Sequence, residues 1–371
     1  MNAFNASSIK KIAISTGGGD APGLNAVIRA ATLSAVKRGW EVYGVRDGFH
    51  GILSPEEYPN GGFIPLTRER ISGITHLGGT ILGTSNRKNP LKYPIVHPDG
   101  TTEEVDRSDE IVRGFRLHSI DALISVGGDG SLAIASVLSK RGLRVISVPK
   151  TIDNDLDKTD VTFGFDTAVG FATEALDRLH STAASHGRVM VVEVMGRYAG
   201  WIALHAGVAG SADAILIPEH PYDIHKVVEK IKERDARGNK FTIVVVAEGA
   251  KPIGGVSSVV ETEAGRAERL GGVGEKVAAE IRSISDKETR VVVLGHLLRG
   301  GSPTSFDRLT ALRFGAAAVR GLEEGQQGVM VALDPPHVKY VPIEEAMGKM
   351  KMVPMDSDIV LTARDLGISF G

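Results

Sequence analysis

The sequence predicts an α/β fold of two doubly wound, Rossmann-like domains with mainly parallel sheets, and three observations support this prediction. Short apolar runs typical of buried strands alternate with segments of helical periodicity through most of the chain. Two of the early runs end in glycine-rich loops that precede helices. With 371 residues, of which 42% are hydrophobic, the chain can form more than one core. We therefore expect ligands beyond the carboxyl ends of strands, in a cleft between the domains.

The first predicted unit is a strand, a glycine loop, a helix and a second strand. Apolar runs place the strands at residues 11–16 and 41–45 and the helix at 24–36. In the connecting loop, Gly18 and Gly19 lack Cβ atoms, so the backbone and the helix N-terminus can approach a phosphate. A tight strand-to-helix turn without a ligand is the alternative.

The second unit repeats this pattern at residues 121–141. A strand at 121–126 leads into a loop, and a helix is expected from 132 to 141. The loop consists of Gly127, Gly128, Asp129, Gly130 and Ser131. The Asp129 carboxylate is suited to hold Mg²⁺ on donor phosphates, although an Asx turn or helix cap is the alternative.

The fourth predicted strand, residues 144–148, ends in an unusual polar segment. Asp153 and Asp155 are two residues apart, so an extended backbone would place both carboxylates on one face. One carboxylate could take a hydroxyl proton while the other positions it, and Lys150 could neutralise phosphate charge. A solvated acidic turn that also includes Asp157 and Asp160 remains the alternative.

Further strands are expected at residues 188–194, 214–217, 241–247 and 290–294, with helices at 223–235 and 274–285. Arg197 follows one of these strands and is suited to clamp a transferring phosphoryl group. His296 and Arg299 follow another and are suited to a sugar phosphate. Each of these side chains, taken alone, is also typical of a surface or structural residue.

Composition and missing motifs exclude several classes of function. The formal net charge of -2 provides no broad positive field for nucleic acid or an acidic membrane. Cysteine is absent, which excludes thiolate chemistry and is typical of a reducing compartment, and no segment has the pattern of a signal peptide or membrane span. Walker, zinc-protease, hydrolase and dinucleotide motifs are also absent. We expect a cytoplasmic protein with small-molecule ligands.

Taken together, the motifs resemble those of the 6-phosphofructokinase family. The matching segments are GGGDAPGLNAVIR at 17–29, GGDGS at 127–131, PKTIDND at 149–155, VEVMGRYAGW at 192–201, the segment around Glu248, and LGHLLRGGSP at 294–303. The resemblance implies a glycolytic phosphotransferase that uses Mg²⁺ and transfers a phosphoryl group in line from ATP to the 1-hydroxyl of fructose 6-phosphate. The PKTIDND and MGR segments argue against related NAD or lipid kinases. An inactive effector-binding subunit would be expected to lose Asp153, Asp129 or Arg197, and all three are present.

The resemblance also implies roles for individual residues. Asp153 is expected to be the general base, with Thr151, Arg197, Lys150 and Gly18 acting on the transferring group. Donor contacts are expected from Gly18, Gly19, Arg87, Gly128, Asp129, Gly130 and Ser131, with Asp129 holding the metal. Sugar-phosphate contacts are expected from Thr151, Asp153, Asp155, Arg188, Met195, Gly196, Arg197, Glu248, Arg290, His296 and Arg299. Arg188 and Arg290 would serve a neighbouring subunit, which implies a homo-oligomer, dimer or tetramer, with shared active sites.

Two residues give opposite indications about the donor. Gly130 is typical of ATP users, because an Asp there would bring negative charge to the nucleotide phosphates. Lys150 is associated with pyrophosphate users, and the branched side chain of Ile134 could crowd an adenine pocket. We favour ATP, with pyrophosphate or ADP as alternatives.

The resemblance further predicts domain limits and regulation. The larger, donor-binding domain is expected at 1–164 plus 298–348, and the smaller, sugar-binding domain at 165–297 plus 349–371. Family members are allosteric enzymes, but basic residues of the bacterial effector site are replaced here by Leu33 and His180, although Arg29 remains. Control by ADP and phosphoenolpyruvate at that site is therefore in question.

Overall fold

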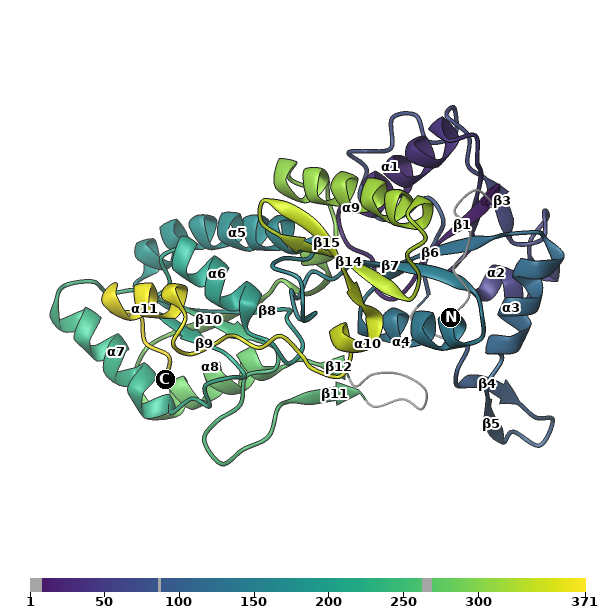
Figure 1. The fold of residues 1–371 in the computed structure, drawn as a ribbon. Coiled ribbons are helices and arrows are strands. Elements are labelled where there is room, and N and C mark those ends of the chain that lie inside the picture. The colour runs from purple at the N-terminus through teal and green to yellow at the C-terminus, as the bar shows by residue number, and fades with distance from the viewer. Residues whose placement is uncertain (1–8, 86–87, 262–268) are drawn as a thin grey trace.

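The larger of two main sheets forms the right-hand half of the molecule in Figure 1. The computed structural model describes residues 9–85, 88–261 and 269–371. The strand order is β15-β14-β7-β6-β1-β2-β3. The strands are β1 (Lys11–Thr16), β2 (Glu41–Val45), β3 (Phe63–Pro65), β6 (Ala122–Gly127), β7 (Arg144–Pro149), β14 (Val329–Asp334) and β15 (His337–Pro342). Neighbouring strands from β14 to β2 pair in parallel, while β3 and β15 add antiparallel edges.

Alternating side chains of the larger sheet belong to two different cores. Ile12 and Ile14 of β1 pack in the cluster that includes residues of α1 (Leu24–Lys37) and α9 (Ser305–Glu323). Ala13 belongs to the opposite cluster, with α3 (Ser108–Leu117) and α4 (Asp129–Lys140). Helices thus cover both faces, which explains why the central strands are almost continuously apolar.

The smaller sheet has the order β13-β8-β10-β9 and is parallel throughout. Its strands are β8 (Val189–Val194), β9 (Ala214–Leu216), β10 (Thr242–Ala247) and β13 (Thr289–Val293). The core on one face includes residues of α5 (Phe165–His186) and α6 (Trp201–Ala209). The other core includes residues of α7 (Ile224–Ala236) and α8 (Val273–Ile284). The structure therefore confirms the predicted fold class, whereas the expected domain limits stay a prediction.

The remaining elements are short or connect the two sheets. They are α2 (His50–Leu53), η2 (Pro55–Glu57), β4 (Tyr93–Val96), β5 (Thr102–Val105), β11 (Val259–Glu261), β12 (Arg269–Leu270), η3 (Gly295–Arg299), α10 (Ile343–Ala346) and α11 (Asp358–Asp365). After α10 the chain returns to the smaller sheet, where the backbone N–H of Ile215 donates to Ser369 O at 2.8 Å. The C-terminal segment therefore spans both halves (Figure 1).

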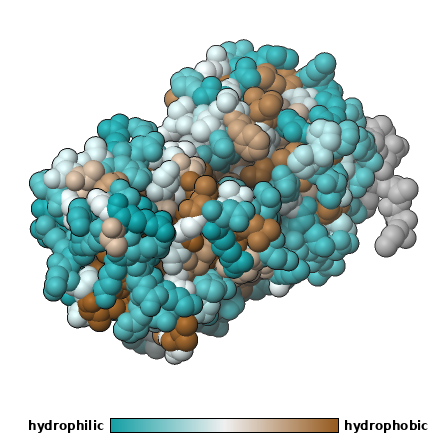
Figure 2. All heavy atoms as spheres, turned by 90° about the vertical axis from the view of Figure 1, so that its left-hand side faces the viewer, coloured by the Kyte–Doolittle hydropathy of each residue, from teal (hydrophilic) through white to brown (hydrophobic). Residues whose placement is uncertain are grey.

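The two sheets with their helices are visible on the molecular surface as two lobes (Figure 2). Figure 2 shows two lobes covered largely by hydrophilic residues, with hydrophobic residues gathered where the lobes meet. Within the described part of the chain, no helix combines the length and apolarity needed to cross a membrane.

The sheet topology brings the two glycine loops together. The chain leaves β1 toward β2 on one side, while β6 pairs with β1 on the other. In open α/β sheets, ligands usually bind in the crevice between two loops that leave the carboxyl ends of neighbouring strands in opposite directions. Most boundaries agree with the prediction to within a residue, but α4 begins at Asp129 and not at residue 132. An acidic residue in the first turn favours this earlier start through the helix dipole.

Candidate active site

Ser131, of the second glycine loop, packs against a glycine of each loop and explains part of their composition. A Cβ on Gly127 would lie 2.1 Å from Ser131 Oγ, and one on Gly17 would lie 2.7 Å from the same atom. The backbone N–H of Gly17 donates to Val126 O at 2.9 Å, which ties the first loop to β6. Gly17 and Gly127 therefore allow close packing of the two loops.

Gly18 adopts a backbone conformation that favours glycine, with φ of 77°. Its N–H donates to Ser85 O at 3.1 Å, and its carbonyl accepts from Thr84 Oγ1 at 2.6 Å. The Gly18 N–H is thus engaged with the protein in this structure. The residue's remaining contribution is space, since an added Cβ would lie 3.4 Å from Lys150 Nζ.

Lys150 joins the loop after β7 to both glycine loops. Its backbone N–H donates to Gly127 O at 3.0 Å, and its buried ammonium donates to Gly19 O. Burial, and then the nearby charge of Arg299, lower the pKa of Lys150 to about 8. A cation held in this way at the glycine loops is placed to meet an anionic ligand.

Asp153 is the most distinctive group of the site. It is buried, its backbone N–H donates to Thr151 Oγ1 at 3.0 Å, and its Oδ2 accepts from the same hydroxyl at 3.3 Å. Its other oxygen, Oδ1, is buried and has no hydrogen-bond partner among the described residues. Burial raises the pKa of Asp153, an effect that the charge of Arg299 opposes. The structure therefore contains a buried basic oxygen that can accept a proton.

Asp155 adds a second buried carboxyl group to this segment. Burial, and then the charge of Asp153, raise the pKa of Asp155 to about 6. Between the two, Asn154 has φ of 52°, and its Oδ1 accepts from Thr162 N at 3.2 Å. The burial of Asp153 and Asp155 argues against a solvated acidic turn at these two residues. Asp160 is exposed, which agrees with the alternative of a solvated turn for that residue.

Glu248 shapes the turn that carries Arg197. Its Oε1 accepts from the backbone N–H groups of Gly196 at 3.2 Å and Arg197 at 2.8 Å. Arg197 has φ of 51°, a conformation that is uncommon for a residue with a side chain. Burial raises the pKa of Glu248, and the two N–H donors oppose that shift. That this carboxylate holds the arginine turn could not be predicted from sequence, because 51 residues separate Glu248 from Arg197.

Arg299, the last residue of η3, contacts the first glycine loop. Its Nη1 donates to Asp20 O at 3.2 Å, and an added Cβ on Gly19 would lie 2.9 Å from the same nitrogen. Its charge acts on both Lys150 and Asp153. His296 is exposed on η3, and Met195 is half-buried directly after β8.

Arg188 and Arg290 lie at the end of the smaller sheet that is remote from the Arg197 turn. Arg188 precedes β8, whereas Met195 follows it, so about 20 Å of strand separates the arginine from this chain's own site. Arg290 pairs with Met190 in the strand register and therefore lies at the same end as Arg188. Glu288 contacts both, at 2.9 Å from Arg188 Nε and 2.5 Å from Arg290 Nη2.

The second glycine loop presents an open surface. Asp129 and Gly130 are exposed in the first turn of α4, and among the described residues outside that turn no atom lies within 4 Å of the position that a Gly130 Cβ would occupy. Ile134, one turn further, is buried in the core beneath the larger sheet. Asn86 and Arg87, of which Arg87 was expected to contact the donor, lie outside the described residues.

Asp129 is the candidate metal ligand. In the described ranges, no three His, Cys, Asp or Glu side chains gather in a way that could hold a metal ion. Mg²⁺ typically takes one or two carboxylates and completes its shell with water and phosphate oxygens. A single exposed carboxylate at a predicted phosphate loop fits that donor set.

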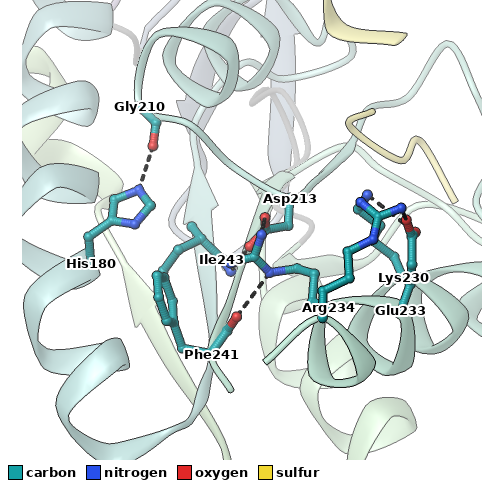
Figure 3. Close-up of polar contacts among 9 residues, drawn as sticks. His180, Gly210, Asp213, Lys230, Glu233, Arg234, Phe241 and Ile243 are labelled. Atoms are coloured by element: carbon teal, nitrogen blue, oxygen red, sulfur yellow. Dashed lines mark hydrogen bonds and ion pairs between the residues drawn. The ribbon is translucent and has the colours of Figure 1, made fainter. Parts of the chain in front are cut away.

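His180, the residue that replaces a basic group of the family's effector site, is engaged within the smaller lobe (Figure 3). Its Nε2 donates to Gly210 O at 2.7 Å, and its ring meets Phe241 edge-on at 5.8 Å. Beside it, Arg234 pairs with Asp213 at 2.6 Å. These groups satisfy one another without an external anion.

Comparison with known proteins yields consistent matches. The family model described as phosphofructokinase matches residues 11–322. An ATP-dependent 6-phosphofructokinase 2 of Clostridium perfringens is 50% identical over 367 residues, covering 98% of each chain. An ATP-dependent 6-phosphofructokinase of Chloroflexus aurantiacus is 51% identical over 371 residues, covering 99% of each. The crystal structure of Pichia pastoris phosphofructokinase in the T-state matches with a TM-score of 0.77 and 31% identity, over 92% of this chain and 36% of that one.

Proposed function

The chain belongs to the phosphofructokinase family, and we propose that it is an ATP-dependent 6-phosphofructokinase. It phosphorylates the 1-hydroxyl of fructose 6-phosphate and gives fructose 1,6-bisphosphate, a step of glycolysis in the cytoplasm. Relatives of about half identity over nearly the whole chain, all named for this activity, support the assignment. The main structural support for this function is Asp153 Oδ1, which is buried and has no hydrogen-bond partner among the described residues. The charges of Arg299 and Arg197 act on the same carboxyl group and favour its ionised form.

Asp153 acts as the general base. It takes the proton of the 1-hydroxyl as that oxygen attacks the γ-phosphorus of ATP, and the bond to the β-γ bridging oxygen breaks. The raised pKa of Asp153 makes its carboxylate a stronger base than an exposed one. Thr151 orients this carboxylate through the hydrogen bond to Oδ2, which leaves Oδ1 for the substrate.

Positive groups stabilise the charge of the transferring phosphoryl group. Lys150 and Arg197 are assigned this role, with Gly18 providing the space that Lys150 needs. Gly19, Gly128, Gly130 and Ser131, with Arg87, are assigned to the donor. Asp129 would hold Mg²⁺ together with the donor phosphates, and the ion would supply neutralisation of phosphate charge.

Fructose 6-phosphate is assigned to the loops beside Asp153. Its contacts are Thr151, Asp153, Asp155, Met195, Gly196, Arg197, Glu248, His296 and Arg299 from one subunit. Because Arg188 and Arg290 lie at the far end of the smaller sheet, they are assigned to the 6-phosphate in a neighbouring subunit. The enzyme is accordingly a homo-oligomer, dimer or tetramer, with shared sites. The expected domain limits are retained with this proposal.

ATP is the donor that the observations favour. The open space at Gly130 accommodates a nucleotide's inner phosphate, and the burial of Ile134 in the core keeps that side chain away from the surface of the loop. Lys150 is compatible with any polyphosphate, so pyrophosphate and ADP are the alternatives to test. Since His180 and its neighbours are mutually satisfied, we expect little activation by ADP at that position.

The experiment measures initial rates of fructose 1,6-bisphosphate formation with Mg²⁺ and fructose 6-phosphate, offering ATP, pyrophosphate and ADP in parallel. We expect activity with ATP. Preference for pyrophosphate or ADP would overturn the donor assignment, and inactivity with all three would overturn the proposed function.

A further inference from the structure

A short C-terminal segment, residues 350–353, lies directly against the loop that carries Asp153 and Asp155. We call it the strap. Met350 forms a β-bridge with Leu156, and the backbone N–H of Lys351 donates to Asp155 O at 2.9 Å. Nearly two hundred residues separate the strap from this loop in the sequence. The contact is therefore a tertiary feature that the sequence motifs do not indicate.

The Lys351 side chain extends this contact along the whole loop. Its ammonium donates to Thr159 O at 3.2 Å, to Asp160 O, and to Asn154 Oδ1 at 3.5 Å. An ammonium has three N–H donors, and these three oxygens can accept all of them. One acceptor belongs to Asn154, which separates the two buried carboxyl residues and has a positive φ. Lys351 thus fixes the outer side of the loop whose inner side carries Asp153.

The strap also contacts the turn that carries Arg197. Trp201 Nε1 donates to Lys351 O at 2.7 Å, and the Lys351 ammonium lies 5.2 Å from the centre of the same indole ring. Val353 N donates to Glu219 Oε1 at 2.9 Å, and this oxygen accepts from Gly200 N at the same distance. Gly200 and Trp201 follow directly after the Arg197 turn. The strap is therefore bonded to both loops that bear the groups assigned to phosphoryl transfer.

We propose that the strap sets the relative position of the Asp153 and Arg197 loops, and that Lys351 is its principal positioning residue. This inference rests on the proposed function. Lys351 contacts the Asp153 loop through Asn154, Asp155, Thr159 and Asp160, all of them on the loop itself, so we assign it an action through the loop. Small displacements of reacting groups reduce the rate strongly, by about a hundredfold for 1 Å. Loss of Lys351 should consequently lower kcat and leave substrate binding largely unchanged.

The test compares Lys351→Met with Lys349→Met in the full-length enzyme. Lys349 is exposed two residues before Lys351, so the same substitution there is a matched control. For Lys351→Met we expect kcat to fall about 10- to 100-fold, while both KM values stay within about threefold of wild type. Lys351→Arg should recover most of the rate because it restores the charge and the donors, and Lys349→Met should behave as wild type.

The outcomes separate the inference from the proposed function. An inactive wild-type enzyme would count against the function and not against the strap. An active wild type with an unchanged kcat in Lys351→Met would overturn the inference, as would a loss confined to KM or no recovery with arginine. If circular dichroism shows that Lys351→Met is unfolded, Trp201→Phe decides. It removes the donor to Lys351 O, and we expect kcat to fall about 3- to 10-fold; an unchanged kcat would overturn the inference.

Discussion

Gly130→Asp should impair ATP use without harming the fold. Gly130 lies in the first turn of α4, and no described atom beyond that turn lies within 4 Å of the position of an added Cβ, so an Asp side chain fits there. Replacing glycine within a helix stabilises it by about 0.5–1 kcal/mol, and an acidic group near the N-terminus adds about 0.3–1 kcal/mol. The melting temperature should therefore stay constant or rise.

The effect on ATP follows from charge repulsion. A carboxylate about 5 Å from a donor phosphate, at an effective dielectric constant of about 20–30, is repelled by about 2–3 kcal/mol per unit charge pair. This free energy corresponds to a loss of about 30- to 150-fold in kcat/KM for ATP. Gly130→Ala is the matched control, because it adds the Cβ without the charge and should keep most of the activity with ATP.

The assay measures initial rates with ATP and with pyrophosphate for wild type and both variants, together with thermal unfolding. Retention of ATP activity within about threefold in Gly130→Asp would show that the repulsion of about 2–3 kcal/mol is absent, and would contradict the placement of the donor phosphates beside Gly130. An equal loss in Gly130→Ala would also refute it, because the effect would then come from volume and not charge.

The pH dependence of kcat/KM should be bell-shaped, and two variants test its two limbs. Burial raises the pKa of Asp153, and the Asp153 carboxylate becomes protonated as the pH falls through that pKa, which produces the acid limb. Asp155→Asn removes a neighbouring negative charge, which lowers the pKa of Asp153, so the acid limb should move to lower pH. Lys150 has a pKa of about 8 and loses its charge above that pH, so the alkaline limb should disappear in Lys150→Met, whose activity should be lower at every pH. An unchanged acid limb in Asp155→Asn, or an unchanged alkaline limb in Lys150→Met, would contradict the assignment of that limb. Separately, Glu288→Gln removes a carboxylate that pairs with both distant arginines, and KM for fructose 6-phosphate should fall about two- to fivefold at constant kcat if those arginines bind its phosphate. An unchanged KM would count against their role in a neighbouring site.

Much of the fold could be predicted because local signals and global architecture agree. The strands β1, β6 and β7 are apolar runs that end at, or directly before, a glycine or proline, and the structure places them side by side in the larger sheet. Since these strands are parallel, their carboxyl ends meet, which is why the Gly19 loop and Lys150 could be expected to lie together. The start of α4 was predicted three residues too late, because glycines in the loop obscured the favourable acidic first turn.

Contacts between distant segments could not be predicted in this way. Glu248 matched a family segment, but its hydrogen bonds to the Arg197 turn depend on how β8 and β10 pair. Lys351 carries no motif, and its contact with the Asp153 loop exists only because the C-terminal segment returns from the larger sheet to the smaller one. The position of Arg188 at the opposite end of β8 follows from its place before the strand, although its ion pair with Glu288 required the structure.

The most direct test of the account replaces the proposed base by its neutral isostere, Asp153→Asn, and compares it with Asp157→Asn from the same acidic segment. We expect kcat with ATP to fall by about a hundredfold to ten-thousandfold in Asp153→Asn, because a general base typically contributes that much. Calorimetry should still detect binding of fructose 6-phosphate, and Asp157→Asn should remain active. A kcat within about tenfold of wild type in Asp153→Asn, or an equal loss in Asp157→Asn, would contradict the assignment of Asp153 as the base.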